Sequence, residues 1–308
     1  MKLLITGCCG HIGSYVADNV FKIKRIKETI IIDDLKYQNY HSLFKSKKKN
    51  NLIFFNKDIS KTNSLDDIKK LDYVIHCASI TNAEKSFDNK KEMYKNNLGC
   101  LRNIIKLCER TKARLIHISS TSVYGKNTKI VDEKCEEKYL IPQSPYADIK
   151  LLEEKILKKN KKKIKFNTYR FGTIAGISKG IRFHTAVNKF CLNAALNQNI
   201  NVYQTALHQY RPYLSLKDAF KVFKFTIERN FFKNDIYNVV SANHTVDQIL
   251  NKIRKNIKNI KIKFVKTKIM NKLSYMVSNE KIKKEGFFLS NNINKEIKDT
   301  INLFRNIK

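Results

Sequence analysis

The fold is decided by the stretch Thr6-Gly7-Cys8-Cys9-Gly10-His11-Ile12-Gly13. It follows the apolar run 3–5 and opens a helical pattern ending near residue 20, so it predicts a strand, a glycine loop and a helix. Gly7 permits a tight turn, Gly10 lets the backbone approach a pyrophosphate, and Gly13 lets the helix pack closely. The free N–H groups at the start of the helix favour bound phosphate. A glycine triplet alone also suits an ordinary turn, but in this context the stretch predicts a dinucleotide site.

A second signal for the cofactor lies about twenty residues further on. The β-branched run 29–32 ends in Asp33-Asp34. A carboxylate at this strand end accepts hydrogen bonds from the adenosine ribose hydroxyls and repels a 2′-phosphate. Asp33 therefore favours NAD over NADP.

Length and composition limit the class of protein. The 308 residues suffice for a large core, either as one extended α/β unit or as two lobes. No stretch approaches eighteen consecutive apolar residues, and the first strand pattern begins at Lys2 without a charged-then-apolar leader, so we expect no membrane insertion and a cytoplasmic location. The seven cysteines form no C-x-x-C pair and have no His-rich partner cluster, so neither a metal site nor a disulfide framework is indicated.

The formal charge of +34 raises the question of a nucleic-acid partner. Ten of the 61 basic residues are arginines and the other 51 are lysines, scattered in runs such as 47–49 and 161–163. Specific nucleic-acid readers use arginine for bidentate contacts, and no recognition module is visible. The charge therefore indicates a solvated, lysine-rich surface, which would also attract an anionic nucleotide substrate.

Short β-rich runs alternate with helical patterns through the first 170 residues. Strands are expected at 2–6, 29–33, 52–55, 73–77, 114–118 and 166–170, and helices at 11–24, 90–110 and 145–159. This alternation predicts an α/β fold with a Rossmann-type, doubly wound parallel sheet. Residues 1–170 would form the NAD-binding domain, to which later segments could return. Residues 171–308 would form mainly a smaller, partly discontinuous substrate lobe, with helices at 184–198, 217–229 and 293–306 and strands at 200–203 and 236–240.

Two further stretches indicate chemistry at the carboxyl edge of the sheet. The strand 114–118 runs into Ser119-Ser120-Thr121-Ser122, which places hydroxyls where open α/β sheets bind ligands. Tyr146 and Lys150 lie four apart on a predicted helix and share a face. An adjacent ammonium favours the phenolate and moves the pKa of Tyr146 down from about 10 toward the working range. Taken alone the pair would suit an ordinary helix, but joined to the glycine loop it predicts an acid/base pair for hydride chemistry.

With these motifs in order, the chain resembles the extended short-chain dehydrogenase/reductase family, in its nucleotide-sugar epimerase and dehydratase branch. The resemblance extends over essentially the whole length. Beyond the motifs above, it rests on Asp58-Ile59, His76-Cys77-Ala78-Ser79, Asn97, Arg170-Phe171-Gly172, Arg211 ahead of Asp218, and Gly286-Phe287.

The resemblance implies a set of site residues. The catalytic residues would be Ser120, Tyr146 and Lys150. The cofactor-binding residues would be Gly7, Gly10, His11, Ile12, Gly13, Asp33, Asp58, Ile59, Ala78, Asn97, Tyr146 and Lys150. The substrate-binding residues would be Ser120, Thr121, Ser122 and Arg211. Three further candidates depart from the family pattern: Thr173 stands where the family often has asparagine, and His184 and Asn188 lie four apart in a segment that does not match the family. It also implies a homodimer paired through the helices 90–110 and 145–159.

Four of these residues have a second interpretation. Asn97 either lines the NAD cleft or only braces a helix, and the cleft is favoured because asparagine is otherwise disfavoured within helices. His184 and Asn188 either face the nucleotide together or serve as scaffolding. Arg211 is either a surface ion pair or the family's clamp on the substrate diphosphate.

Departures from the family pattern limit the reactions that we expect this chain to catalyse. Dehydratases and decarboxylases of the branch usually place an acidic residue directly or soon after the catalytic hydroxyl, where this chain has Thr121 and Ser122. Elimination is therefore disfavoured, and we expect an NAD-dependent 4-epimerase acting on a UDP-, GDP- or dTDP-linked sugar through a transient 4-keto sugar, in surface polysaccharide or glycoconjugate precursor synthesis. The alternatives are a 4-dehydrogenase or keto-reductase that releases the keto sugar and, from another class, a catalytically inactive relative that binds RNA or serves assembly.

Overall fold

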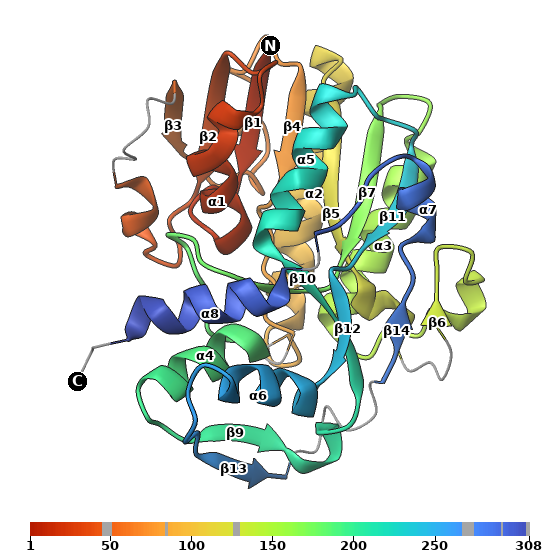
Figure 1. Cartoon of the computed structure of the whole chain (residues 1–308). Coiled ribbons are helices and arrows are strands. Elements are labelled where there is room, and N and C mark those ends of the chain that lie inside the picture. Colours follow the sequence, from red (N-terminus) through yellow and green to blue (C-terminus); the bar gives the residue numbers. More distant parts are fainter. Residues whose placement is uncertain (45–50, 84–85, 126–129, 267–273, 291, 306–308) are drawn as a thin grey trace.

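A seven-stranded parallel sheet forms the centre of the computed structural model, which describes residues 1–44, 51–83, 86–125, 130–266, 274–290 and 292–305 (Figure 1). The strands, in the order in which they lie side by side, are β11 (Asp235–Val239), β7 (Phe166–Phe171), β5 (Arg114–Ser120), β4 (Tyr73–His76), β1 (Lys2–Thr6), β2 (Glu28–Asp33) and β3 (Leu52–Asn56). Every neighbouring pair is parallel. The chain order reverses between β1 and β4, and this reversal opens a ligand crevice at the carboxyl ends of the strands.

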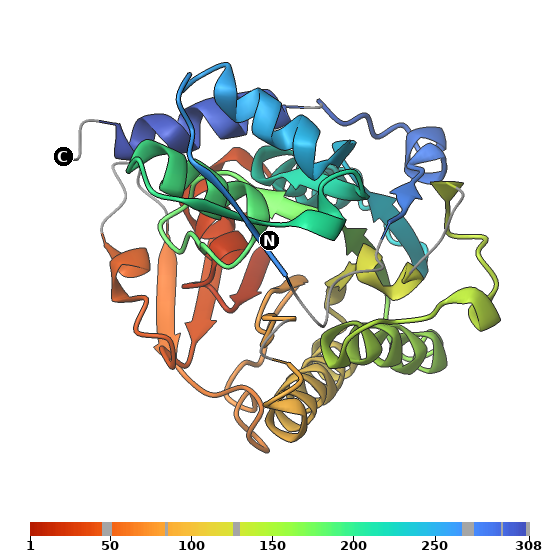
Figure 2. The same cartoon turned by 90° about the horizontal axis from the view of Figure 1, so that it is seen from below.

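Helices cover both faces of the sheet, so the predicted doubly wound architecture is confirmed. One face carries α1 (His11–Asn19) and α5 (Leu216–Glu228), and the other carries α2 (Lys90–Thr111) and α3 (Pro145–Lys159) (Figures 1 and 2). Each pair lies over a separate apolar cluster, because the branched residues of a parallel strand point alternately to the two faces.

The remaining elements lie beyond the carboxyl edge of the sheet or flank it, and we call the part built around the three-stranded sheet the lobe. That sheet has the order β12 (Ala242–Thr245), β10 (Tyr210–Ser215), β8 (Thr173–Ala175). Its helices are α4 (Ala186–Ala195), α6 (Val246–Arg254) and α8 (Ile293–Phe304), which share an apolar cluster. The shorter elements are β6 (Ile130–Val131), β9 (Ile200–Tyr203), β13 (Ile262–Val265), β14 (Met276–Val277), α7 (Glu280–Lys284), and the 3₁₀ helices η1 (Val20–Lys22), η2 (Tyr40–Leu43), η3 (Thr121–Tyr124), η4 (Glu137–Tyr139) and η5 (Gln204–Ala206).

The strands of the large sheet match the sequence prediction to within two residues at each end. The helix expected at 184–198 is shorter: it begins at Ala186, after Thr185 in extended conformation, and ends at Ala195, two residues before Asn197 takes a left-handed φ of 54°. His184 therefore lies outside the helix. β11 pairs with β7, so residues 235–239 join the large sheet, while the proposed boundary at residue 170 stays a prediction. No helix in the described ranges is long and apolar enough to cross a bilayer.

Candidate functional site

The glycine loop between β1 and α1 is closely packed. Gly7 has a φ of +65°, and a Cβ on it would lie 2.6 Å from the backbone nitrogen of Ala78. A Cβ on Gly13 would lie 2.1 Å from the Gly7 carbonyl oxygen, so the first turn of α1 packs directly on the loop. Around Gly10 there is more room, since a Cβ would meet Arg182 Nη2 at 3.2 Å and the Gly7 oxygen at 3.3 Å. This open cradle at a helix N-terminus fits a pyrophosphate.

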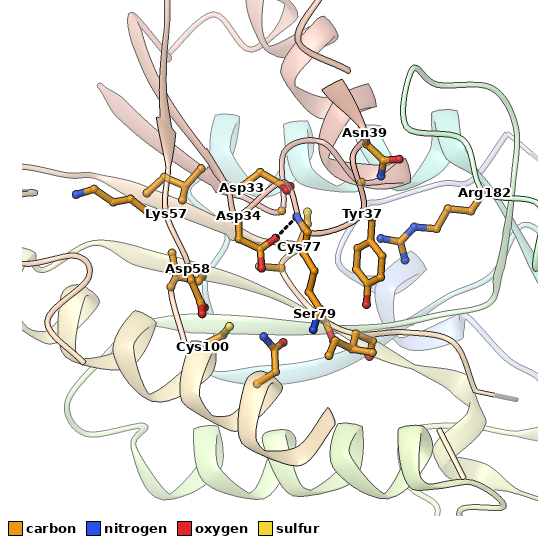
Figure 3. Close-up of a pocket in the computed structure, with 18 residues that line it drawn as sticks. Asp33, Asp34, Tyr37, Asn39, Lys57, Asp58, Cys77, Ser79, Cys100 and Arg182 are labelled. Carbon is orange, nitrogen blue, oxygen red and sulfur yellow. Dashed lines mark hydrogen bonds between the residues drawn. The ribbon is translucent and has the colours of Figure 1, made fainter. Parts of the chain in front are cut away.

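A pocket extends from this loop along the carboxyl ends of β1, β2 and β4 (Figure 3). Six of the residues expected to bind the cofactor line it: Gly7, Gly10, Asp33, Asp58, Ile59 and Ala78. The other six do not line it: His11, Ile12, Gly13, Asn97, Tyr146 and Lys150. The pocket is also lined by residues to which the sequence interpretation gave no role in binding, among them Asp34, Lys36, Tyr37, Asn39, Lys57, Ser79, Ile80, Asn96 and Arg182.

Asp33 stands at the end of β2 and is held by the backbone. Its carboxylate accepts hydrogen bonds from the Cys9 amide at 2.9 Å and from the Leu35 amide at 3.0 Å. Burial raises the pKa of Asp33 above its usual value, and the two amide donors counteract this shift. The carboxylate is thus fixed between the glycine loop and the pocket.

Two of the residues predicted to bind the cofactor make hydrogen bonds to backbone groups of the protein. The buried His11 ring donates from Nε2 to the Gly176 carbonyl at 2.9 Å, which ties α1 to the lobe, and burial lowers the pKa of His11 to about 4. Asn97 is fully buried and bonds both the N–H and the carbonyl of Ile80, at 2.8 and 3.1 Å. Asn97 therefore braces the pocket-lining segment that follows β4, and its effect on the cofactor would act through that segment.

The three proposed catalytic residues come together at the end of β5. Ser120 closes the strand, and its hydroxyl accepts hydrogen bonds from the amide and hydroxyl of Ser122 at 3.2 and 2.9 Å. α3 begins after Ser144, whose side chain caps the helix. Tyr146, in the first turn, lies close enough to Ser120 for the serine hydroxyl to lower the pKa of the phenol. The Lys150 ammonium lies 6.0 Å from the centre of the Tyr146 ring.

Behind Lys150 lies a buried group of polar side chains in contact with one another, formed by Glu153 and His117. The Lys150 Nζ is 2.8 Å from Glu153 Oε2, and the same oxygen is 3.0 Å from Nε2 of His117 on β5. Burial raises the pKa of Tyr146, Lys150 opposes the rise and Glu153 adds to it, so the phenol pKa stands above its usual value. The expected lowering by Lys150 is therefore outweighed here, because the phenol is desolvated and Glu153 partly neutralises the ammonium.

Of the proposed substrate residues, Thr121 follows β5 of the large sheet, whereas Arg211 and Thr173 lie on the lobe sheet. Thr121 is buried and donates to the Phe171 carbonyl at 3.2 Å, with the Tyr275 hydroxyl 3.4 Å away. Arg211 on β10 donates to Gln209 at 3.0 Å, whereas its buried Nη1 has no partner among the described residues. Thr173 lies beside Tyr213 in the lobe sheet.

The pairing of His184 with Asn188 is corrected by the structure. Asn188 is fully buried and holds backbone at both ends, accepting from the Gly176 amide at 3.1 Å and donating to the Arg182 carbonyl at 3.2 Å. His184 precedes the helix and is exposed. The two residues do not share a helical face because α4 starts two residues after His184, and Asn188 serves as scaffolding for the segment 176–182.

One cluster of potential metal ligands occurs in the part of the chain that the structure describes, formed by Cys8, Cys9 and Asp33 within 4.8 Å of one another. The two sulfurs are 3.9 Å apart. The contact with Cys9, together with burial, raises the pKa of the Cys8 thiol far above its usual range, so that thiol is neutral. A neutral thiol is a poor metal ligand, and the expected absence of a metal stays a prediction.

Comparisons with known proteins agree with the geometry. The sequence pattern of the NAD dependent epimerase/dehydratase family matches residues 3–240. A trifunctional UDP-glucose 4,6-dehydratase/UDP-4-keto-6-deoxy-D-glucose 3,5-epimerase/UDP-4-keto-L-rhamnose-reductase of Arabidopsis thaliana is 25% identical over 302 residues, covering 93% of this chain and 44% of the relative. The chain spans about half the length of the first curated relatives that it matches.

Solved structures share the fold over nearly the whole chain. The UDP-N-acetylglucosamine 4-epimerase of Methanobrevibacter ruminantium has a TM-score of 0.85 and 22% identity, covering 98% of this chain and 97% of that one. The dTDP-glucose 4,6-dehydratase of Streptomyces venezuelae with NAD bound has a TM-score of 0.88 and 18% identity, covering 99% and 97%. The chain belongs to the NAD-dependent epimerase/dehydratase family, within the extended short-chain dehydrogenases/reductases. NAD is the cofactor of this family, and the pocket fits it.

Proposed function

We propose that this protein is an NAD-dependent nucleotide-sugar 4-epimerase. The observation that carries the proposal is the arrangement of Ser120 at the end of β5 with Tyr146 and Lys150 on α3, the Lys150 ammonium lying 6.0 Å from the centre of the Tyr146 ring. Positions 121 and 122 are occupied by hydroxyl residues. Relatives of this chain are named both as 4-epimerases and as 4,6-dehydratases. A dehydratase must move a proton and water next to the ketone, and neither Thr121 nor Ser122 has the acidic group for that step.

The residues of the chain have separable tasks in this reaction. Tyr146 accepts the proton of the sugar 4-hydroxyl, and Ser120 holds the same oxygen by a hydrogen bond. Lys150 supplies positive charge to the phenolate. NAD, when bound, would supply the hydride chemistry at carbon 4, and inversion would require the transient 4-keto sugar to turn so that its other face receives the hydride. The unpartnered Arg211 Nη1 would hold the substrate diphosphate, for which a guanidinium is well suited.

Retention of the cofactor separates an epimerase from a dehydrogenase. The segment 176–182 of the lobe lies on the glycine loop and α1: His11 bonds Gly176, the Gly180 amide donates to Ser14 Oγ at 2.9 Å, and Lys179 pairs with Asp18 at 3.1 Å. A lobe tied to the loop that would hold the cofactor is suited to a cycle in which the hydride returns to the same sugar. This arrangement favours the epimerase over an enzyme that exchanges NAD in every turnover.

The test is incubation with a panel of UDP-, GDP- and dTDP-linked sugars, following reduced nicotinamide by absorbance and products by chromatography. The proposal expects a 4-epimer without net NADH. Accumulation of NADH would assign a dehydrogenase instead. No turnover of any sugar, together with tight RNA binding in moderate salt, would make the cationic surface the functional feature.

We also propose a homodimer. α2 and α3 pack side by side on one face of the sheet, where a second copy could add its own pair to form a four-helix contact (Figure 2). Sedimentation at micromolar concentration is expected to give twice the mass of 36.0 kDa.

A further inference from the structure

Arg182 approaches the glycine loop from the lobe. It follows β8 in the segment 176–182, and Asn188 fixes its backbone by donating to its carbonyl oxygen at 3.2 Å. Its guanidinium donates through Nη1 to the Thr81 hydroxyl, in the segment that follows β4. The other terminal nitrogen, Nη2, would lie 3.2 Å from a Cβ on Gly10. Figure 3 shows the guanidinium directed into the pocket, next to Tyr37.

The Arg182 guanidinium has a positive charge. In the described part of the chain it makes no ion pair with a carboxylate. Burial lowers the pKa of Arg182, while Tyr37 and Asp33 oppose the change, and an arginine stays protonated under these conditions. A partly desolvated cation over a helix N-terminus is a site for an anion, because its charge and the amides of α1 attract the same group.

We propose that Arg182 binds the diphosphate of NAD, so that the lobe supplies a cationic contact to the cofactor held by the sheet. The position over Gly10 selects the cofactor's diphosphate, because Gly10 is the residue of the loop where phosphate approaches most closely. The substrate's diphosphate has a different candidate, Arg211 Nη1, on β10. This inference rests on the family's cofactor and does not depend on which sugar reaction is catalysed.

The experiment compares Arg182→Gln with Arg254→Gln in NAD-free protein. Arg254 is an exposed arginine at the end of α6, so its replacement removes the same charge far from the pocket. The probes are NAD, ADP and adenosine, titrated by calorimetry. Arg182→Gln is expected to weaken NAD and ADP by about tenfold or more and adenosine by less than about threefold, because only the first two have a diphosphate. Arg254→Gln is expected to leave all three within about twofold.

Three outcomes for Arg182→Gln would overturn the inference. Unchanged ADP and NAD affinities would mean that Arg182 does not contact the diphosphate, and equal losses for ADP and adenosine would mean that it only supports the pocket. Weaker UDP binding at saturating NAD, with NAD affinity unchanged, would assign Arg182 to the substrate.

Because Arg182→Gln could affect folding, Thr81→Val serves as the second variant. It keeps the charge of Arg182 but removes the hydroxyl that accepts its hydrogen bond, and we expect the affinity for ADP to fall by about threefold. No loss of ADP affinity in Thr81→Val, should Arg182→Gln fail to fold, would also contradict the inference.

Discussion

The two sides of the NAD pocket are built in different ways. On the sheet side, short contiguous motifs at strand ends place the groups, and each motif contains its own turn, cap or helix start. On the lobe side, the segment 176–182 lies over the glycine loop through single contacts made by His11, Ser14 and Lys179. The sheet side is thus specified locally, whereas the lobe side depends on contacts between residues more than 160 positions apart. This difference predicts that chemistry and nucleotide choice reside on the sheet side and cofactor retention on the lobe side.

The largest effect is expected on the sheet side, from Tyr146→Phe. The change removes the general base while the ring stays, so turnover should fall by about a hundredfold or more. NAD and UDP affinities should stay within about twofold, because the phenol oxygen is the only group lost. Steady-state turnover on the sugar identified in the panel, together with calorimetry, checks both parts. Parent-like turnover in this variant would remove the basis for the enzymatic assignment.

The next effect is expected from Asp33→Ala at the end of β2. NAD affinity should fall by about tenfold, since the ribose hydroxyls lose a charged acceptor. NADP affinity should change less, because the carboxylate that repels the 2′-phosphate is also gone. Parallel titrations with the two cofactors measure the ratio. Equal NAD and NADP affinities in the unmodified protein would rule out the proposed role of Asp33.

On the lobe side, Gly180→Ala tests the covering segment. A Cβ on Gly180 would lie 2.3 Å from the Cys9 carbonyl oxygen and 2.6 Å from that of Gly10, so the segment must move away from the loop. Overpacking of this kind costs about 1–3 kcal/mol, and we expect NAD to dissociate at least several-fold faster while the catalytic rate at saturating NAD changes little. Lys179→Ala, which removes an ion pair without intruding on the loop, is the control and should have a smaller effect. If the two variants release NAD at the same rate, close packing is not what retains the cofactor.

The smallest effect is expected from Glu153→Gln, which changes the buried carboxylate behind Lys150. The carboxylate raises the pKa of Tyr146, so removing its charge should lower that pKa. Because the phenolate is the active form, the rising limb of the rate against pH should move to lower pH. Asp148→Asn, an exposed acid on the same helix, should leave the limb in place. A shift to higher pH in Glu153→Gln would show that Glu153 acts mainly by holding Lys150 in position.

The sequence predicted the sheet and the proposed acid/base residues because each depends on local rules. The period of the apolar runs gives the strands, and a four-residue spacing places Tyr146 and Lys150 on one face of α3. Glu153 was also accessible to this reasoning, since it lies three positions after Lys150 on the same helix, but its second partner His117 lies on another element. Arg182 was not accessible, because its contacts with Thr81 and Gly10 exist only after the lobe folds onto the sheet. Asn97 shows the opposite case: the family resemblance and the low helix propensity of asparagine indicated the cleft, whereas the hydrogen bonds to Ile80 define a brace.

The chain passes repeatedly between the large sheet and the lobe, and this limits how the two can move. It leaves the sheet at Gly172, returns at the junction of Ser215 with Leu216, and leaves again after Val239. A domain on a single linker can swing about a hinge, but several connections along one boundary must all bend together, which favours a small sliding motion. We therefore expect cofactor exchange to require a collective displacement slower than loop fluctuations, and one NAD molecule to outlast many catalytic cycles.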